Sequence, residues 1–299
     1  MAKLYSALLA LSLIWGTSFL FIKLLVEPIG AWGVVFGRSL FGTIILLIIL
    51  VIRKKWGEFK HLPFKMITLV SLLNNALPWF LIALSETRIS SSYASLINAS
   101  TPIWTIMIGF IFFQNKLGKF QWIGITVGFT GIVLLSGVNV ENMKEQSVIG
   151  LITMVMATIC YGLSTHLSKK YLSKVSITMT SASTLMVSTL ISLIMVLFTD
   201  TSIFVKMLDA SVFLGLIGLG VFGSGIAYLL YYYCIQKGSP EFASLVTYLV
   251  PISAMIWGSI ILNERIHVFM VIGFVLILAG VYLTSSKKKE SSSKLSRTA

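Results

Sequence analysis

Charged residues are scarce in this sequence. Only 11% of its 299 residues are Asp, Glu, Lys or Arg, whereas about a quarter of the residues in an average soluble protein are charged. A soluble domain of this size would lack the charge to cover its surface. Instead, 57% of the residues are hydrophobic and they occur in long runs, as expected for a protein whose solvent is the lipid bilayer.

Motifs for metal binding, cofactor binding and catalysis are also missing. The two cysteines, Cys160 and Cys234, lie inside apolar runs, and no Cys-x-x-Cys or His/Cys cluster occurs, so the sequence predicts neither a disulfide framework nor a zinc site. It contains no phosphate-binding Gly-x-x-x-x-Gly-Lys-Ser/Thr loop and no His-Glu-x-x-His or Gly-x-Ser-Gly pattern. We therefore predict no cofactor, no metal site and no enzymatic activity.

Basic residues outnumber acidic ones, and the net charge is +13. They lie in short segments between the apolar runs and at the C-terminus, so membrane topology explains them better than nucleic-acid binding. If the N-terminus is cytoplasmic, about 17 of the 23 Lys and Arg residues fall on the cytoplasmic side and about 5 on the other. The positive-inside rule therefore predicts that both termini are cytoplasmic.

The apolar runs are each close to the roughly 20 residues that a helix needs to cross a bilayer. Backbone groups in lipid have no other hydrogen-bond partner, so such runs are predicted to be helices. We expect an all-α membrane protein with about ten transmembrane helices, the first of them an uncleaved N-terminal helix. The runs are Leu4–Ile22, Gly30–Ile52, Met66–Leu84, Ser92–Phe113, Phe120–Val138, Val148–Leu167, Ile177–Phe198, Ser211–Cys234, Phe242–Leu262 and Val268–Thr284.

The sequence contains an internal repeat. Displaced by 149 residues, Ser90–Ser136 falls on Ser239–Ser285 without a gap, and about 14 of the 47 positions are identical. A displacement of 146 residues places Gly16, Ser18 and Lys23 on Gly162, Ser164 and Lys169, with Trp15 on Tyr161. Matched proline and glycine positions are not what random apolar runs share, so we interpret the repeat as a duplication. They are Pro102 with Pro251, Gly109 with Gly258, Gly124 with Gly273, and Gly131 with Gly280.

Five helices in each half mean that the second half enters the membrane from the opposite side. The predicted organisation is a first repeat at 1–139, a connecting loop at 140–147, a second, inverted repeat at 148–286 and a basic cytoplasmic tail at 287–299. Inverted repeats are characteristic of secondary transporters, whose substrate sites lie near the midplane between the repeats. Two nearly equivalent packings also give a physical basis for alternating access.

Several stretches resemble the EamA family of the drug/metabolite transporter superfamily. Trp15-Gly16-Thr17-Ser18-Phe19 with Lys23, Pro28 and Phe36-Gly37-Arg38 is similar to its first two helices. Asn263-Glu264-Arg265 resembles the family's Gly-Glu-Arg, whereas the first-half counterpart, Asn115-Lys116, lacks the acid. The resemblance implies the ten-helix fold and transport activity over residues 4–285. Related members export amino acids and similar metabolites, and others are linked to drugs or sugar-like compounds.

Polar groups inside the apolar runs are the candidates for substrate binding, because such groups are costly in lipid. Asn74, Asn75 and Trp79 lie around Pro78 in the third run, where they line a cavity or form interhelical hydrogen bonds. Asn98 and the pair Thr247–Tyr248 lie close to a proline in matching runs. The remaining candidates are Trp15, Ser18, Tyr161, Ser164, Ser224 and Tyr228.

Two ionisable residues in the runs have competing interpretations. A central Arg costs roughly 2.5–3.5 kcal/mol to insert into the membrane. Arg38 therefore either faces a cavity and attracts an anionic group, or it snorkels to the interface or bonds a carbonyl in the bundle. We favour the second interpretation, without direct substrate contact. His166 either relays protons or is simply solvated, and we favour solvation. Acids lie only at the ends of runs, as Glu27, Glu86, Asp200 and Glu264 do. Without a mid-membrane carboxylate to carry protons, facilitated diffusion or another coupling route is favoured.

The sequence thus predicts a secondary transporter in the plasma (inner) membrane that exports small metabolites such as amino acids by alternating access. Drug efflux and metabolite uptake remain alternatives, as does a non-transporting membrane scaffold or receptor. The expected partners are a small-molecule substrate and the lipid bilayer, not nucleic acid. The sequence leaves the substrate, coupling ion and oligomeric state open.

Overall fold

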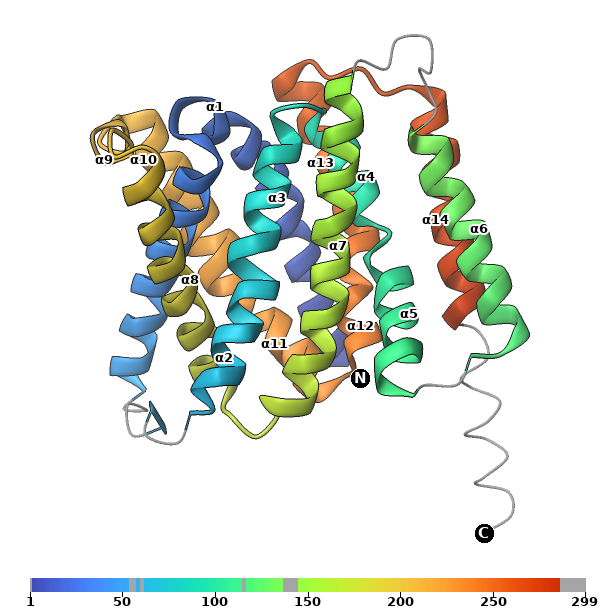
Figure 1. The fold of residues 1–299 in the computed structure, drawn as a ribbon, viewed down its shortest axis with the longest axis horizontal. Coiled ribbons are helices and arrows are strands. Elements are labelled where there is room, and N and C mark those ends of the chain that lie inside the picture. Colours follow the sequence, from blue (N-terminus) through green and yellow to red (C-terminus); the bar gives the residue numbers. More distant parts are fainter. Residues whose placement is uncertain (1, 54–57, 60–61, 115–116, 137–144, 286–299) are drawn as a thin grey trace.

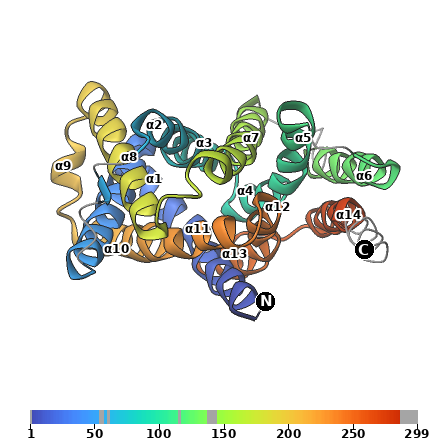
Figure 2. The ribbon, with the colours of Figure 1, turned by 90° about the horizontal axis from the view of Figure 1, so that it is seen from below.

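The computed structural model describes residues 2–53, 58–59, 62–114, 117–136 and 145–285, and these contain helices but no strand. The helices form one bundle, with the α6 and α14 pair at one end (Figures 1 and 2). The elements are α1 (Ala2–Ile52), α2 (Phe64–Ser71), η2 (Leu72–Ala76), α3 (Leu77–Glu86), α4 (Ser91–Asn98), α5 (Thr101–Phe113), α6 (Lys119–Ser136), α7 (Glu145–Tyr171), α8 (Ile177–Thr199), α9 (Ile203–Lys206), α10 (Ala210–Ile217), η3 (Gly218–Ile226), α11 (Ala227–Lys237), α12 (Pro240–Ser244), α13 (Val246–Leu262) and α14 (Val268–Ser285).

Helix α1 contains two of the predicted apolar runs. It is 51 residues long, and a straight helix of that length would extend about 75 Å, far beyond a bilayer. The helix is interrupted at Gly30, whose φ of 65° and ψ of 172° are not helical, two residues after Pro28. Glycine tolerates this positive φ because it has no Cβ. The chain therefore reverses direction at one margin of the bundle, as Figure 1 shows.

Two π-helical segments interrupt other spans. η2 joins α2 to α3 immediately before Pro78, and η3 joins α10 to α11 within the glycine-rich stretch. The wider turn is visible at Ser224, whose hydroxyl donates to the carbonyl oxygen of Leu219 at 3.2 Å, five residues earlier. Such segments are frequent at functional sites. Here they carry three of the predicted site residues, Asn74, Asn75 and Ser224.

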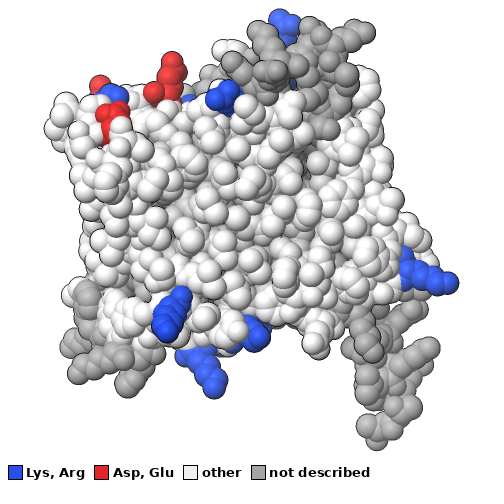
Figure 3. Space-filling view, viewed as in Figure 1, with Lys and Arg blue, Asp and Glu red and all other residues white. Residues whose placement is uncertain are grey.

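The chain is a multi-pass membrane protein. Within the described ranges, seven helices are long and apolar enough to cross a membrane, and α1 counts as one of them. Shorter apolar helices occupy Lys119–Leu134 and Val268–Gly280. Figure 3 shows charged side chains at the upper and lower margins of one face and none across its middle, as expected for a surface in contact with lipid. The count of ten crossings and the cytoplasmic orientation of the termini remain predictions.

Glu264 holds the start of α4 from the other half of the chain. Its Oε1 accepts from the backbone N–H of Ser91 at 2.7 Å, and its Oε2 accepts from the backbone N–H of Ser92 at 2.9 Å. Both serine hydroxyls also donate to this carboxylate. The first amides of a helix have no intrahelical acceptor, and a negative charge there complements the helix dipole. The acid of the family-like Asn263-Glu264-Arg265 motif therefore fixes one helix relative to another.

We expect Glu264→Ala to lower the free energy of unfolding by about 2 kcal/mol, because the α4 amides lose a charged acceptor at a half-buried site. The measurement is unfolding in mixed detergent micelles, followed by tryptophan fluorescence. Arg265→Ala is the matched control, since Arg265 is exposed beside Glu264 and should change stability by less than about 0.5 kcal/mol. Equal stability of the two variants would show that the capping bonds contribute nothing.

Candidate functional site

A cavity lies between the two halves of the chain. Its volume is about 50 Å³. The first half provides Trp15, Ser18, Phe19, Ile22, Arg38, Trp79, Ile82, Asn98 and Thr101, and the second provides Tyr161, Thr165, Tyr231, Ala243, Ser244, Val246, Thr247 and Val250.

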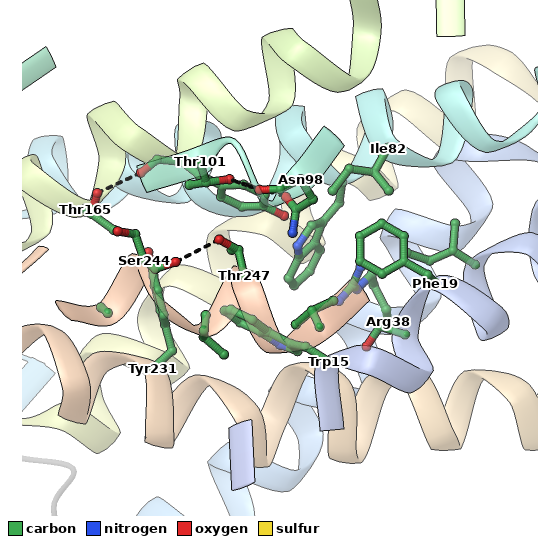
Figure 4. A pocket seen from close by; sticks show the side chains of 17 residues that line it. Trp15, Phe19, Arg38, Ile82, Asn98, Thr101, Thr165, Tyr231, Ser244 and Thr247 are labelled. Atoms are coloured by element: carbon green, nitrogen blue, oxygen red, sulfur yellow. Dashed lines mark hydrogen bonds between the residues drawn. The ribbon is translucent and has the colours of Figure 1, made fainter. Parts of the chain in front are cut away.

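The cavity has two chemically different ends, which Figure 4 displays. Arg38 lies beside Phe19 and Ile82 at one end, and hydroxyl groups from α5, α7 and α13 lie at the other. The Thr101 hydroxyl donates to the carbonyl oxygen of Asn98, the last residue of α4, at 2.7 Å, and the Thr247 hydroxyl donates to that of Ser244, the last residue of α12, at 2.8 Å. Their protons are therefore engaged, and their lone pairs remain as acceptors.

Arg38 is held at the cavity by two contacts. Its Nε donates to the Ser224 hydroxyl at 3.1 Å, and its guanidinium carbon lies 3.6 Å from the centroid of the Trp79 ring. The side chain is only 3% exposed. Snorkelling of Arg38 to the interface, one part of our favoured interpretation, is therefore wrong. The side chain is bonded inside the bundle, as the other part expected, but η3 and α3 provide a hydroxyl and an aromatic face rather than a carbonyl.

His166 also differs from the favoured interpretation. It is 7% exposed, its Nε2 is 2.8 Å from the carbonyl oxygen of Thr105, and its ring stacks on Phe113 with centroids 4.7 Å apart. The histidine is therefore buried rather than solvated. It bonds α5 to α7 and does not line the cavity.

Asn74 is the centre of a buried hydrogen-bond network next to the cavity. Its Oδ1 accepts from the Ser164 hydroxyl at 2.7 Å and from the Tyr231 hydroxyl at 3.3 Å. The Tyr228 hydroxyl donates to its backbone carbonyl at 2.9 Å. A fully bonded buried network joins helices and specifies their packing. Three predicted substrate-binding residues, Asn74, Ser164 and Tyr228, thus take the interhelical role that the sequence left as an alternative for the asparagine.

The structure brings together half of the predicted site residues. Trp15, Ser18, Trp79, Asn98, Tyr161 and Thr247 line the cavity. The predicted residues Asn74, Asn75, Ser164, Ser224, Tyr228 and Tyr248 do not. Among these, Asn75 and Tyr248 have buried side-chain atoms without a hydrogen-bond partner in the described chain. Whether the lining residues contact a substrate remains a prediction.

Sequence reasoning missed other lining residues. Thr165 and Tyr231 lie one helical turn after Tyr161 and Tyr228, so helical spacing from those candidates could have found them. Phe19 and Ile22 follow Trp15 by four and seven residues on the same face of α1. The apolar members carry no signal of their own, since they resemble any lipid-facing residue.

A sequence model of the EamA-like transporter family matches residues 2–137 and 148–286. The chain belongs to this family. The resemblance predicted from its sequence motifs is therefore confirmed, and this EamA protein is a transporter of the drug/metabolite type. The cavity described above lies between the two matched segments.

In the described part of the chain, no three His, Cys, Asp or Glu residues lie close enough together to hold a metal ion.

Two relatives of this EamA transporter are similar over nearly their whole lengths. An uncharacterized transporter of Archaeoglobus fulgidus is 26% identical, over 92% of this chain and 95% of its own. The uncharacterized inner membrane transporter YedA of Escherichia coli K12 is 27% identical, over 95% and 93%. A solved crystal structure superposes with a TM-score of 0.70 at 15% identity, covering 95% of this chain and 97% of the other, and so shares the fold.

Proposed function

We propose that this EamA transporter exports small metabolites such as amino acids across the plasma membrane by alternating access between two inverted five-helix repeats. The observation that carries the proposal is a cavity lined by both family-matched segments. Contacts that recur in each segment accompany it. Family membership supports transport, and the inner-membrane relative YedA supports the location. The recurring contacts support the repeat.

The first recurring contact involves Lys23 on α1. Its Nζ donates to the backbone carbonyl oxygens of Glu86 and, at 3.0 Å, Ile89. These carbonyls lie where α3 ends and α4 is about to begin. A helix leaves its last carbonyls without intrahelical donors, and an ammonium group satisfies them while complementing the dipole.

Lys169 on α7 makes the same contact in the second half. Its Nζ donates to the carbonyl oxygens of Ile235 at 3.0 Å and Gly238 at 3.1 Å. These residues follow Glu86 and Ile89 by 149 residues, which is the offset of the sequence repeat. A chance match of apolar sequence would not reproduce a charged contact, so this correspondence supports the proposed duplication.

Helix ends and glycine contacts recur in the same way. Gln114 and Asn263, also 149 residues apart, are the described non-glycine residues with positive φ, at 56° and 53°. Each ends a helix. The backbone N–H of Gln114 donates to the carbonyl oxygen of Gly109, and that of Asn263 donates to the carbonyl oxygen of the matched Gly258. Lining residues also match, since Trp15 corresponds to Tyr161. Two halves with equivalent helix-end contacts support two packings of similar energy, one open to each side of the membrane.

The test is metabolite profiling of the medium around cells that overproduce the protein. We expect one class of amino-acid-like compound to accumulate outside several-fold above the vector level. A variant with Trp15→Ala and Asn98→Ala should lose this accumulation at equal membrane abundance, because both residues line the cavity. Trp122→Ala is the matched control, since Trp122 is 46% exposed on α6, away from the cavity, and should export normally.

Each alternative has its own outcome. Export is contradicted if the wild-type medium matches the empty vector, and labelled uptake and drug-resistance assays then distinguish uptake from drug efflux. If the double variant exports as well as wild type, transport stands and the cavity is not the substrate site. Absence of flux of any probe in either direction would favour a scaffold or receptor.

A further inference from the structure

Arg38 brings a positive charge to the cavity without an acidic partner. The other described cavity-lining residues are uncharged, and no described Asp or Glu forms an ion pair with Arg38. Glu86 is a buried acid close enough to interact electrostatically with Arg38, but it forms neither a hydrogen bond nor an ion pair with the guanidinium. Buried charges are ordinarily paired in direct contact, so a guanidinium without an ion-pair partner favours an anion in the cavity.

The contacts that Arg38 does make leave its outer edge unused. The Ser224 hydroxyl takes the Nε donor, and the Trp79 ring covers one face. In the described chain, no residue accepts from the Nη nitrogens, whose N–H groups form the fork that matches a carboxylate. The two contacts hold the guanidinium in place, so little side-chain freedom is lost when an anion binds.

The remainder of the cavity complements an organic acid rather than an inorganic ion. Phe19 lies beside Arg38, and Trp15 and Val250 add further apolar walls to the cavity (Figure 4). At the far end, Thr101 and Thr247 have already donated their protons and present lone pairs. From one end to the other, the cavity thus presents the Arg38 guanidinium, apolar side chains and hydroxyl oxygens that accept hydrogen bonds. An amino group on the guest could donate at the acceptor end.

We propose that Arg38 is the anchor for a carboxylate, and that the transported substrates are small organic carboxylates with an apolar side group. This rests on the proposed function in taking the cavity as the substrate site. The cavity has no described acidic lining residue to attract a lone cation, so organic cations are poor ligands. The α-amino group of an amino acid is accepted but is not required.

Three probes that share a phenyl group separate these charge requirements. They are 3-phenylpropionate, which carries only the carboxylate, L-phenylalanine, which carries both groups, and phenethylammonium, which carries only the amine. Binding to the purified full-length protein is measured by titration calorimetry and by the rise in thermal unfolding midpoint. We expect both carboxylates to bind at least about tenfold more tightly than the amine.

Variants of Arg38 test the anchor directly. Arg38→Gln should weaken both carboxylates at least about thirtyfold and leave the weak binding of phenethylammonium unchanged or stronger. Arg38→Lys keeps the charge but loses the fork, so an intermediate loss is expected. Arg88→Gln is the matched control, because Arg88 is exposed and outside the cavity, and its affinities should equal those of wild type.

The outcomes separate this inference from the proposed function. Equal binding of phenethylammonium, unchanged carboxylate affinity in Arg38→Gln, or no binding of either carboxylate by wild type would each overturn the anchor. The wild-type comparison decides the charge preference even if Arg38→Gln does not fold. Export without charge preference leaves transport standing and removes the anchor. Carboxylate binding without any flux leaves the anchor and contradicts export.

Discussion

Lys169→Met is expected to lower the free energy of unfolding by about 3 kcal/mol. The Lys169 ammonium donates to carbonyl oxygens at the end of α11, including that of Gln236 at 2.9 Å. Methionine keeps the apolar stem but removes the charge, so these carbonyls lose their donor where the helix dipole is negative. The measurement is reversible unfolding in mixed detergent micelles.

Two further lysine variants make this prediction specific. Lys170→Met is the matched control, since Lys170 is exposed on the same helix and lies 5.2 Å from the centroid of the Tyr171 ring, so its loss should cost less than about 1 kcal/mol. Lys23→Met should cost about as much as Lys169→Met, because the two contacts correspond. If Lys169→Met and Lys170→Met were equally stable, the contacts of Lys169 with the carbonyl oxygens would not contribute to the free energy of unfolding.

Gly280→Ala is expected to destabilise the protein by about 2 kcal/mol. At a helix position with room for a methyl group, Gly→Ala stabilises the protein by about 0.5–1 kcal/mol. The sign of the change in unfolding free energy therefore tests whether the two helices are in close contact. A Cβ at Gly280 would lie 2.5 Å from the Gly124 carbonyl oxygen and 2.5 Å from the Gly128 nitrogen on α6. These are backbone atoms, so α6 and α14 must separate and lose packing that small residues permit.

The neighbouring position provides the control for Gly280. Ala279 is exposed on the same turn of α14, and Ala279→Val should change stability by less than about 0.5 kcal/mol. Gly131→Ala should behave like Gly280→Ala, because its Cβ would lie 2.7 Å from the Gly273 carbonyl oxygen. A stabilising effect of Gly280→Ala in the same unfolding assay would show that the two helices are not in close contact.

The candidate site was only partly predictable from the sequence. Trp15, Asn98 and Thr247 were identified because an aromatic or polar residue near a proline or a repeat position is unusual in lipid. Asn74 and Ser224 gave the same signal, yet one centres a network and the other receives a hydrogen bond from Arg38. Polarity shows that a residue needs a partner, but it does not show whether that partner is protein or substrate.

The two ionisable residues illustrate the same limit. Arg38 was expected to snorkel to the interface or to bond a carbonyl, and His166 to be solvated, because an isolated charge or imidazole is most stable near water. Both are buried, since Ser224, Trp79 and Thr105 meet them from helices far apart in the chain. Such partners lie 41 to 186 residues away and leave no local pattern.

The sequence by itself determined the membrane class, the helical content and the family, because hydrophobic runs and matched glycines act over one helix or one repeat. It also located two runs that the structure joins as α1, with the chain reversal at Gly30. Only the tertiary structure decided which polar residues face the cavity and which bond to each other. That choice depends on helix rotation and on packing between the two halves, which are set by contacts between distant segments and not by the local order of residues.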